Sequence, residues 1–318
     1  MRHYASLVST VGTSLKGNMK NISAEAEAAY AAGNLIPVLQ AMKGLPEDAR
    51  ALGAEINTIA DMAARGHLSW PPARLAFLVS DTPDGERIGS LLEGYYRSRH
   101  GIEDCLVLKC GGLKDDDVAA FRTTGLRNLV RNLAGFVRER PVGEVAINAT
   151  GGYKAQILYA GVLGQAMKVP VFYKHEAFNM IMELPPLPVA FDMGFWLSRI
   201  DDFLQLDSAG EVPAAEVAAL AESPEAATLL EEVTVEGTAW AALTPIGQVF
   251  HESFLYQYHA TRTNLLPPES GLAPGDKKLV EEGGAPGDRP PGFRDCIARI
   301  FRQPWVTGAR TFYYNPDL

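Results

Sequence analysis

Short apolar runs alternate with longer amphipathic segments over the first two hundred residues. The apolar runs predict strands within residues 4–12, 73–82, 103–113, 144–154 and 169–176. The intervening segments repeat apolar residues at helical spacing and predict helices within residues 23–64, 85–101, 117–140 and 155–168. Such alternation is typical of a mostly parallel sheet covered by helices on both faces. The predicted fold class is therefore α/β, with a Rossmann-like domain over residues 1–200.

The pattern changes after residue 200. Residues 201–262 predict two helices, a short strand or wing, and a helix with Thr244 as N-cap and Pro245 at its first position, which is a winged-helix-like order. Residues 265–291 are dense in Pro and Gly and predict a mobile loop or linker. One further helix and one strand complete a small α+β segment over residues 263–318, which is too short to bury a core of its own.

Composition and charge limit the classes of function. The 318 residues are 47% hydrophobic, which is normal for a folded protein, and no apolar run is long enough to span a bilayer, so we expect a cytoplasmic protein. The net charge of −9 argues against general duplex binding. Residues 201–236 hold ten acidic side chains and no Lys or Arg, so insertion of the winged-helix-like segment into a DNA groove is disfavoured; a linker and dimer contact is the favoured role. Cys105 and Cys110 lack a CxxC spacing and are expected in the core.

Polar residues follow four of the five predicted strands. The carboxyl ends of parallel strands are where ligands bind in open α/β sheets, so these residues are candidates for ligand binding. They are Gly12, Thr13 and Ser14; Ser80, Asp81 and Thr82; Asn148, Thr150, Gly151, Gly152, Tyr153 and Lys154; and Tyr173, His175 and Glu176.

The turn after the fourth strand, "NATGGYK", carries the most information. Gly151 and Gly152 allow close approach of the backbone to a ligand, and Thr150 is expected to cap the following helix. Lys154 falls in the first helical turn, where the helix dipole disfavours a cation unless an anion lies nearby. The alternative is an ordinary strand-to-helix turn with an exposed lysine. The turn has neither the dinucleotide-binding nor the P-loop fingerprint. No metal is predicted, because His175 and Glu176 lack further ligands in the sequence.

Five segments together resemble a known family. They are "STVGTSL", "SDTPDG", "FRTTGLRNLVRNL", "INATGGYKAQ" and "VPVFYKHEAFNMIMELPPLPVAFD". In order and spacing they are similar to the CARF domain of type III CRISPR ancillary effectors, in the APE-type branch that includes Csm and Csx proteins. The resemblance covers about residues 1–195.

The resemblance implies a sensor of cyclic oligoadenylate in antiviral defence. It implies a homodimer in which the ring-shaped ligand lies across the seam, and a two-fold site suits a ligand with two-fold symmetry. The implied activator is cyclic tetra-adenylate, with cyclic hexa-adenylate as the other ring size, and no cofactor is implied. The turns after the first, second and fourth strands would line phosphates and riboses, and Tyr173, His175 and Glu176 would lie nearer the adenines.

The effector is expected in the C-terminal segment. The layout resembles CARF–RelE proteins, ribosome-dependent messenger-RNA interferases that cleave without a metal, while the motifs of HEPN and PD-(D/E)xK nucleases are missing from the sequence. The resemblance implies a catalytic surface formed by Arg294, Arg299, Arg302, Arg310, Tyr313 and Tyr314. An amphipathic helix with solvated arginines is the alternative. The segment is neutral and short for a RelE sheet, so the catalytic part is expected to be incomplete.

Three other functions stay open at this point. The chain would be a non-enzymatic ligand-gated regulator if the winged-helix-like module binds DNA or a protein. It would carry another CARF-coupled nuclease if the tail has a different fold. It would be a ring nuclease if the sensor cleaves its own ligand by positioning a ribose 2′-OH for in-line attack.

Overall fold

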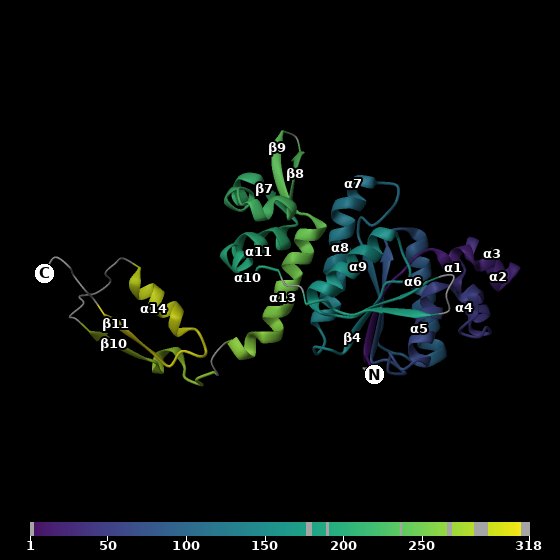
Figure 1. The fold of residues 1–318 in the computed structure, drawn as a ribbon, viewed down its shortest axis with the longest axis horizontal. Coiled ribbons are helices and arrows are strands. Elements are labelled where there is room, and N and C mark those ends of the chain that lie inside the picture. Colours follow the sequence, from purple (N-terminus) through teal and green to yellow (C-terminus); the bar gives the residue numbers. More distant parts are fainter. Residues whose placement is uncertain are drawn as a thin grey trace. The chain divides into compact units, whose positions relative to one another are not determined.

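The chain forms two compact units, Met1–Gln257 and Tyr258–Leu318, in a computed structural model (Figure 1). The structure describes residues 3–175, 180–188, 191–235, 237–265, 269–282 and 292–312. The first unit contains the predicted sensor and residues 201–257 of the predicted winged-helix-like module, and the predicted boundaries after residues 200 and 262 stay predictions.

A six-stranded sheet organises the first unit, with strand order β3-β2-β1-β4-β5-β6. Its strands are β1 Ser6–Thr10, β2 Arg74–Ser80, β3 Cys105–Cys110, β4 Val145–Asn148, β5 Val171–Lys174 and β6 Ile181–Leu184. The first five strands pair in parallel, and β6 pairs antiparallel with β5. Central strands of a parallel sheet are covered on both faces, and every residue of β1 is accordingly buried. The α/β prediction is therefore confirmed, and β6 is an additional strand that the sequence pattern did not predict.

Helices cover both faces of this sheet (Figure 1). One face packs on the first helices and on α6 through a core that includes Leu7, Phe77 and Tyr96. The other face packs on α8 and α9 through Val8, Leu133 and other apolar residues. The helices are α1 Ser14–Gly17, α2 Met19–Ile22, α3 Ala24–Ala31, α4 Leu35–Lys43, α5 Gly53–Ala64, α6 Pro83–His100, α7 Val118–Ala120, α8 Leu126–Arg138 and α9 Lys154–Met167. A π-helical turn, Phe121–Gly125, joins α7 to α8.

The helical stretch predicted over residues 23–64 is divided into α3, α4 and α5. The chain breaks after α3 at Gly33, whose φ of +75° is the left-handed conformation that glycine adopts without strain. It breaks again after α4, where Gly44 and Pro46 precede a short 3₁₀ turn over Arg50–Leu52. The alanine-rich composition favours helix, but these residues end it twice.

The winged-helix-like module follows in the sequence, and its last helix extends beyond Gln257, where the first unit ends. Its elements are α10 Met193–Ser198, α11 Ile200–Ala209, β7 Glu211–Pro213, α12 Ala218–Ala221, β8 Leu230–Val235, β9 Thr238–Leu243 and α13 Pro245–Leu265. The strands form a sheet of order β7-β9-β8, in which β8 and β9 make an antiparallel wing. The Thr244 hydroxyl accepts a hydrogen bond from the Gly247 N–H at 3.0 Å, so the predicted cap of the last helix is confirmed.

The second unit is a β-α-β arrangement. Strands β10 Lys278–Glu282 and β11 Gly308–Phe312 pair in parallel, and α14 Phe293–Phe301 lies between them in sequence. The predicted loop over residues 265–291 therefore contains a strand. Lys277 is buried and donates hydrogen bonds to the carbonyl oxygens of Phe301 and Gln303 at 2.7 and 2.6 Å. The bond to Phe301 satisfies a carbonyl group in the last turn of α14, and the bond to Gln303 ties Lys277 to the loop that follows the helix.

Candidate ligand-binding site

The turns after β1 and β4 lie side by side at the carboxyl end of the sheet. The chain leaves β1 toward β2 on one side, and β4 pairs on the other side of β1, so this is a topological switch point. Ligands of open α/β sheets bind at such points. A Cβ on Gly12 would lie 2.6 Å from the backbone nitrogen of Gly152. The two predicted glycine turns are thus in direct contact, and a side chain at position 12 would push them apart.

A carboxylate that sequence reasoning missed lies beneath both turns. Glu55 projects from α5 and is fully buried. Its Oε1 atom accepts a hydrogen bond from the Gly12 N–H at 2.8 Å, and its Oε2 atom lies 3.4 Å from the Ser14 hydroxyl. Burial raises the pKa of the Glu55 carboxyl group, which the hydrogen bonds only partly oppose. A signal was present, because Glu55 continues the apolar stripe of Leu52 and Ile59 on α5.

The turn after β4 directs some of its predicted site residues inward. The Asn148 side chain is fully buried, donates to Ser9 Oγ at 3.1 Å, and accepts from the Thr150 hydroxyl at 2.7 Å. The Thr150 hydroxyl also accepts the Lys174 N–H at 3.0 Å. These two side chains therefore fix the turn to β1 and β5, and their contact with a ligand stays a prediction.

Helix α9 begins at the end of this turn. Its N-cap is Tyr153, whose N–H donates to the Gln156 side chain at 2.6 Å, so the prediction that Thr150 caps the helix is wrong. Gly152 has a φ of +104°, which only glycine adopts readily. Lys154 is the first helical residue, as predicted, and its side chain is exposed. A helix N-terminus beside an exposed lysine is chemically suited to an anion.

The polar side chains of the turn after β2 have hydrogen-bond or ion-pair partners within the protein. The Thr82 hydroxyl caps α6 by accepting the Gly85 N–H at 3.0 Å, and it lies 2.8 Å from Ser80 Oγ. Asp81 pairs with Lys109 at 2.7 Å and accepts the Gly112 N–H at 3.0 Å. Hydrogen bonding to Lys109 lowers the pKa of Asp81. The structure brings these side chains to the predicted edge but already gives them protein partners.

The remaining predicted site residues lie at the end of β5 and in the second unit. Tyr173 and His175 at the end of β5 have ring centroids 6.3 Å apart, while Glu176 lies outside the described residues. In the second unit, Arg294, Arg299 and Arg302 are exposed on α14, and Arg310 is exposed on β11. Tyr313 and Tyr314 lie outside the described residues, so a catalytic cluster there stays a prediction.

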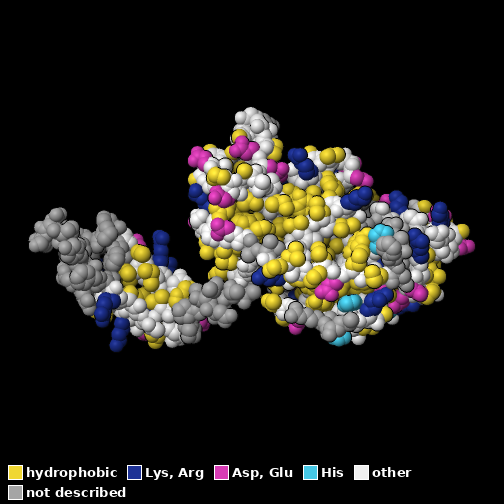
Figure 2. Space-filling model, viewed as in Figure 1, with side chains coloured by type: hydrophobic (Ala, Val, Ile, Leu, Met, Phe, Trp, Pro, Cys, Tyr) yellow, Lys and Arg dark blue, Asp and Glu magenta, His cyan; other side chains and the backbone are white. Residues whose placement is uncertain are grey.

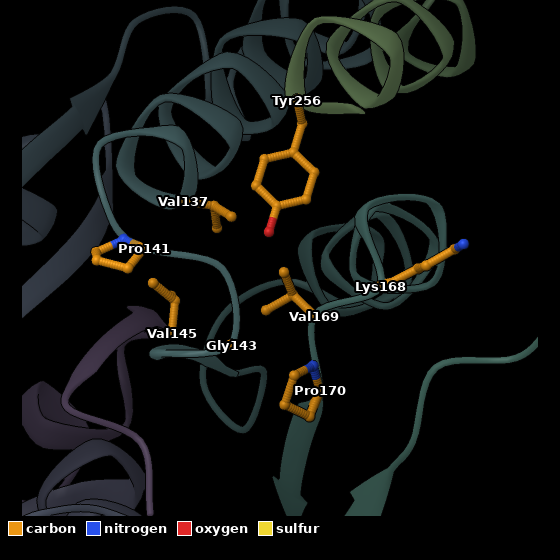
Figure 3. A pocket seen from close by; sticks show the side chains of 8 residues that line it. All are labelled: Val137, Pro141, Gly143, Val145, Lys168, Val169, Pro170 and Tyr256. Carbon is orange, nitrogen blue, oxygen red and sulfur yellow. The ribbon is translucent and has the colours of Figure 1, made fainter. Parts of the chain in front are cut away.

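A small cavity lies at the opposite end of the sheet (Figure 3). It is lined by residues that precede or begin β4 and β5, including Val145 and Pro170, and the Tyr256 hydroxyl points into it from α13. Its volume of about 10 Å³ is that of a single water molecule, so it is no nucleotide pocket.

Two further predictions concern the burial of the cysteines of β3 and the presence of a membrane-spanning helix. Cys105 and Cys110 are buried in β3, as predicted. Within the described ranges, no helix combines the length and the apolar character needed to cross a membrane.

The large sheet and the paired turns define a Rossmann-like α/β protein whose strand-end turns form a candidate ligand-binding edge. Residues 50–187 match the model of a family described as CRISPR-associated protein (Cas_APE2256). The matched range is less than half of the chain, and it contains Glu55 and the turns after β2, β4 and β5. The chain is thus similar to CRISPR-associated proteins over most of its large sheet.

The other comparisons add little. No curated protein matches the chain. Among solved structures, the chain is similar to Can2 from Sulfobacillus thermosulfidooxidans in complex with cyclic tetra-adenylate, at 11% identity and a TM-score of 0.30, covering 85% of this chain and 68% of that one. A TM-score this low carries no argument about shared architecture or ligand.

Proposed function

We infer that the protein is a cyclic-oligoadenylate sensor of type III CRISPR defence, and that cyclic tetra-adenylate is its activator. The contact between the glycine turns of β1 and β4 at the switch point carries this inference. It presents close-packed backbone and the start of α9, with exposed Lys154, on one edge. The match of residues 50–187 to a CRISPR-associated family supports the choice of ligand.

We propose that the site is completed by a second copy of the chain. The ligand is a ring of repeated nucleotides, and a two-fold dimer would offer it the same turns twice. Apolar side chains are exposed on α9 and β6, which Leu158 at 62% and Leu184 at 46% illustrate. Figure 2 shows hydrophobic side chains over the part of this unit where α9 lies. Burial of such side chains between two copies would stabilise the dimer.

Binding is tested by calorimetry with cyclic tetra-adenylate, cyclic hexa-adenylate and linear tetra-adenylate as a control. Lys154→Gln should weaken binding about ten- to a hundredfold, because one well-made contact to a phosphate contributes roughly 1.5–3 kcal/mol. Lys168→Gln is the matched control, since Lys168 is exposed at the other end of α9. Absence of binding to both rings would refute the sensor function. Equal affinities of the two variants would refute the role of Lys154.

The proposed output is a RelE-type, ribosome-dependent messenger-RNA interferase in the second unit. The exposed arginines of α14 and β11 support a surface for RNA phosphates, since guanidinium groups bind phosphate in bidentate fashion. The assay supplies translating ribosomes, naked RNA or duplex DNA, each with and without the ring. Cleavage that requires both ribosomes and ring supports the interferase. DNA binding without cleavage supports a regulator, and consumption of the ring alone supports a ring nuclease.

A further inference from the structure

Glu55 has a position that the packing of α5 alone does not explain. The helix buries Ile56, Ile59 and Met62 in the apolar core, and a carboxyl group in such a place is costly unless hydrogen bonds compensate it. No ion pair of Glu55 is present among the described residues, so the bonds from Gly12 and Ser14 carry that compensation. Burial on α6 is the main reason why the pKa of Tyr96 is raised, and Glu55 makes a minor contribution to the same shift.

The carboxyl group contacts both glycine turns. A Cβ on Gly151 would lie 2.0 Å from Glu55 Oε1, so the carboxyl group occupies the space that a side chain at position 151 would need. The same oxygen accepts the Gly12 N–H at 2.8 Å. Glu55 Oε1 therefore lies against both the turn after β1 and the turn after β4, although these turns are far apart in the sequence.

This contact also orients the backbone. Because the Gly12 N–H points inward to Glu55, it is withdrawn from any ligand on the outer side of the turns. A ligand at this edge would contact the outer surface of the two turns, and their separation depends on the Glu55 carboxyl group beneath them. A difference of about an ångström in such a separation is enough to change affinity or rate substantially.

We propose that Glu55 is a positioning residue of the ligand site: its carboxyl group locks the turns after β1 and β4 in the mutual position that receives the ring. The ligand in this inference rests on the proposed function, whereas the locking of the turns does not. A neutral amide of the same shape would preserve the lock, since glutamine accepts the Gly12 N–H through its oxygen. Removal of the group would leave the Gly12 N–H without its acceptor and open a space beneath Gly151, while the bonds of Asn148 and Thr150 remain.

The test compares Glu55→Ala, Glu55→Gln and the control Thr58→Ala. Thr58 is equally buried on α5, but its hydroxyl donates only to the Ala54 carbonyl within the helix. Amide hydrogen exchange of the ligand-free protein should speed up about tenfold or more at both turns in Glu55→Ala. It should stay near the wild-type rate in Glu55→Gln and in Thr58→Ala, even if Thr58→Ala lowers the melting temperature as much.

Calorimetry with cyclic tetra-adenylate is the second readout. Glu55→Ala should bind about tenfold or more weakly, and Glu55→Gln should bind within a few-fold of the wild type because the amide oxygen keeps the hydrogen bond from the Gly12 N–H. Exchange at the turns that is unchanged in Glu55→Ala, or accelerated equally in Glu55→Gln, would overturn the positioning role. If the wild type binds no ring while the exchange pattern holds, the sensor function falls and the locking role stands.

Discussion

His251 makes the stability of the first unit depend on pH. It lies on α13 and is fully buried. Its Nδ1 atom accepts the Trp196 Nε1–H at 3.2 Å, and since an indole N–H only donates, Nδ1 must be unprotonated. Asp207 Oδ2 is 3.8 Å from Nε2, too far for a hydrogen bond. Burial is the main reason why the pKa of His251 falls from 6.5 to about 4.

The sign and size of the effect follow from this shift. The folded protein keeps His251 neutral, whereas the unfolded chain takes up a proton below pH 6.5, so acidification favours unfolding. The contribution of His251 is intact above pH 6.5 and is lost as the pH falls from 6.5 toward 4. Over the range from pH 7.5 to 5, the loss in the free energy of unfolding is about 2 kcal/mol.

The measurement is urea unfolding of the wild type and His251→Gln at several pH values, followed by circular dichroism. Glutamine still accepts the Trp196 N–H but does not titrate. The difference in free energy of unfolding between the two proteins isolates His251, because other groups contribute to both. His100 is such a group, since burial lowers its pKa as well. A difference that stays constant from pH 7.5 to 5 would refute the reasoning.

Two other side chains lead to simple stability predictions. Arg131→Ala removes hydrogen bonds to the Asp207 carboxylate at 3.0 Å and carbonyl at 2.7 Å, so urea unfolding should show a loss of about 1–3 kcal/mol. The exposed pair of Arg65 is the control, and an equal loss in Arg65→Ala would count against this assignment. Lys277→Met removes both bonds from the buried ammonium group, so hydrogen exchange in the second unit should rise by the equivalent of about 2 kcal/mol while the first unit is unchanged. Unaltered exchange in the second unit would contradict it.

The strands of the large sheet were predictable because burial imposes a plain pattern on them. Central strands are covered on both faces, and β2 and β4 are nearly continuous apolar runs, while β1 places Leu7 and Val8 among small buried polar residues. Strand β6 was missed because an edge strand needs no such pattern, and its residues Met182–Leu184 are exposed. Strand β10 was missed because its five residues stand between Pro- and Gly-rich stretches that favour loops.

The position of the site was predictable, but the direction of its side chains was not. A polar turn after a parallel strand must lie at the carboxyl edge, so the turn containing Gly151 was found from its place in the sequence. Whether Asn148 faces outward depends on Ser9, which is 139 residues away and offers it a buried partner. Glu55 was missed for the same reason, since its role depends on turns that only the fold brings to α5.

The π-helical turn before α8 contacts Tyr153 beside the turn after β4, and α8 itself contacts the winged-helix-like module. In the π-helical turn that leads into α8, the Phe121 ring packs edge-on against Tyr153 with centroids 5.3 Å apart, next to the turn after β4. Farther along, Arg127 donates to the Gly210 carbonyl at 3.0 Å. Packed helices shift as units rather than deform continuously. The π-helical turn and α8 therefore form one continuous stretch of structure between Tyr153 and the residues that bind the module.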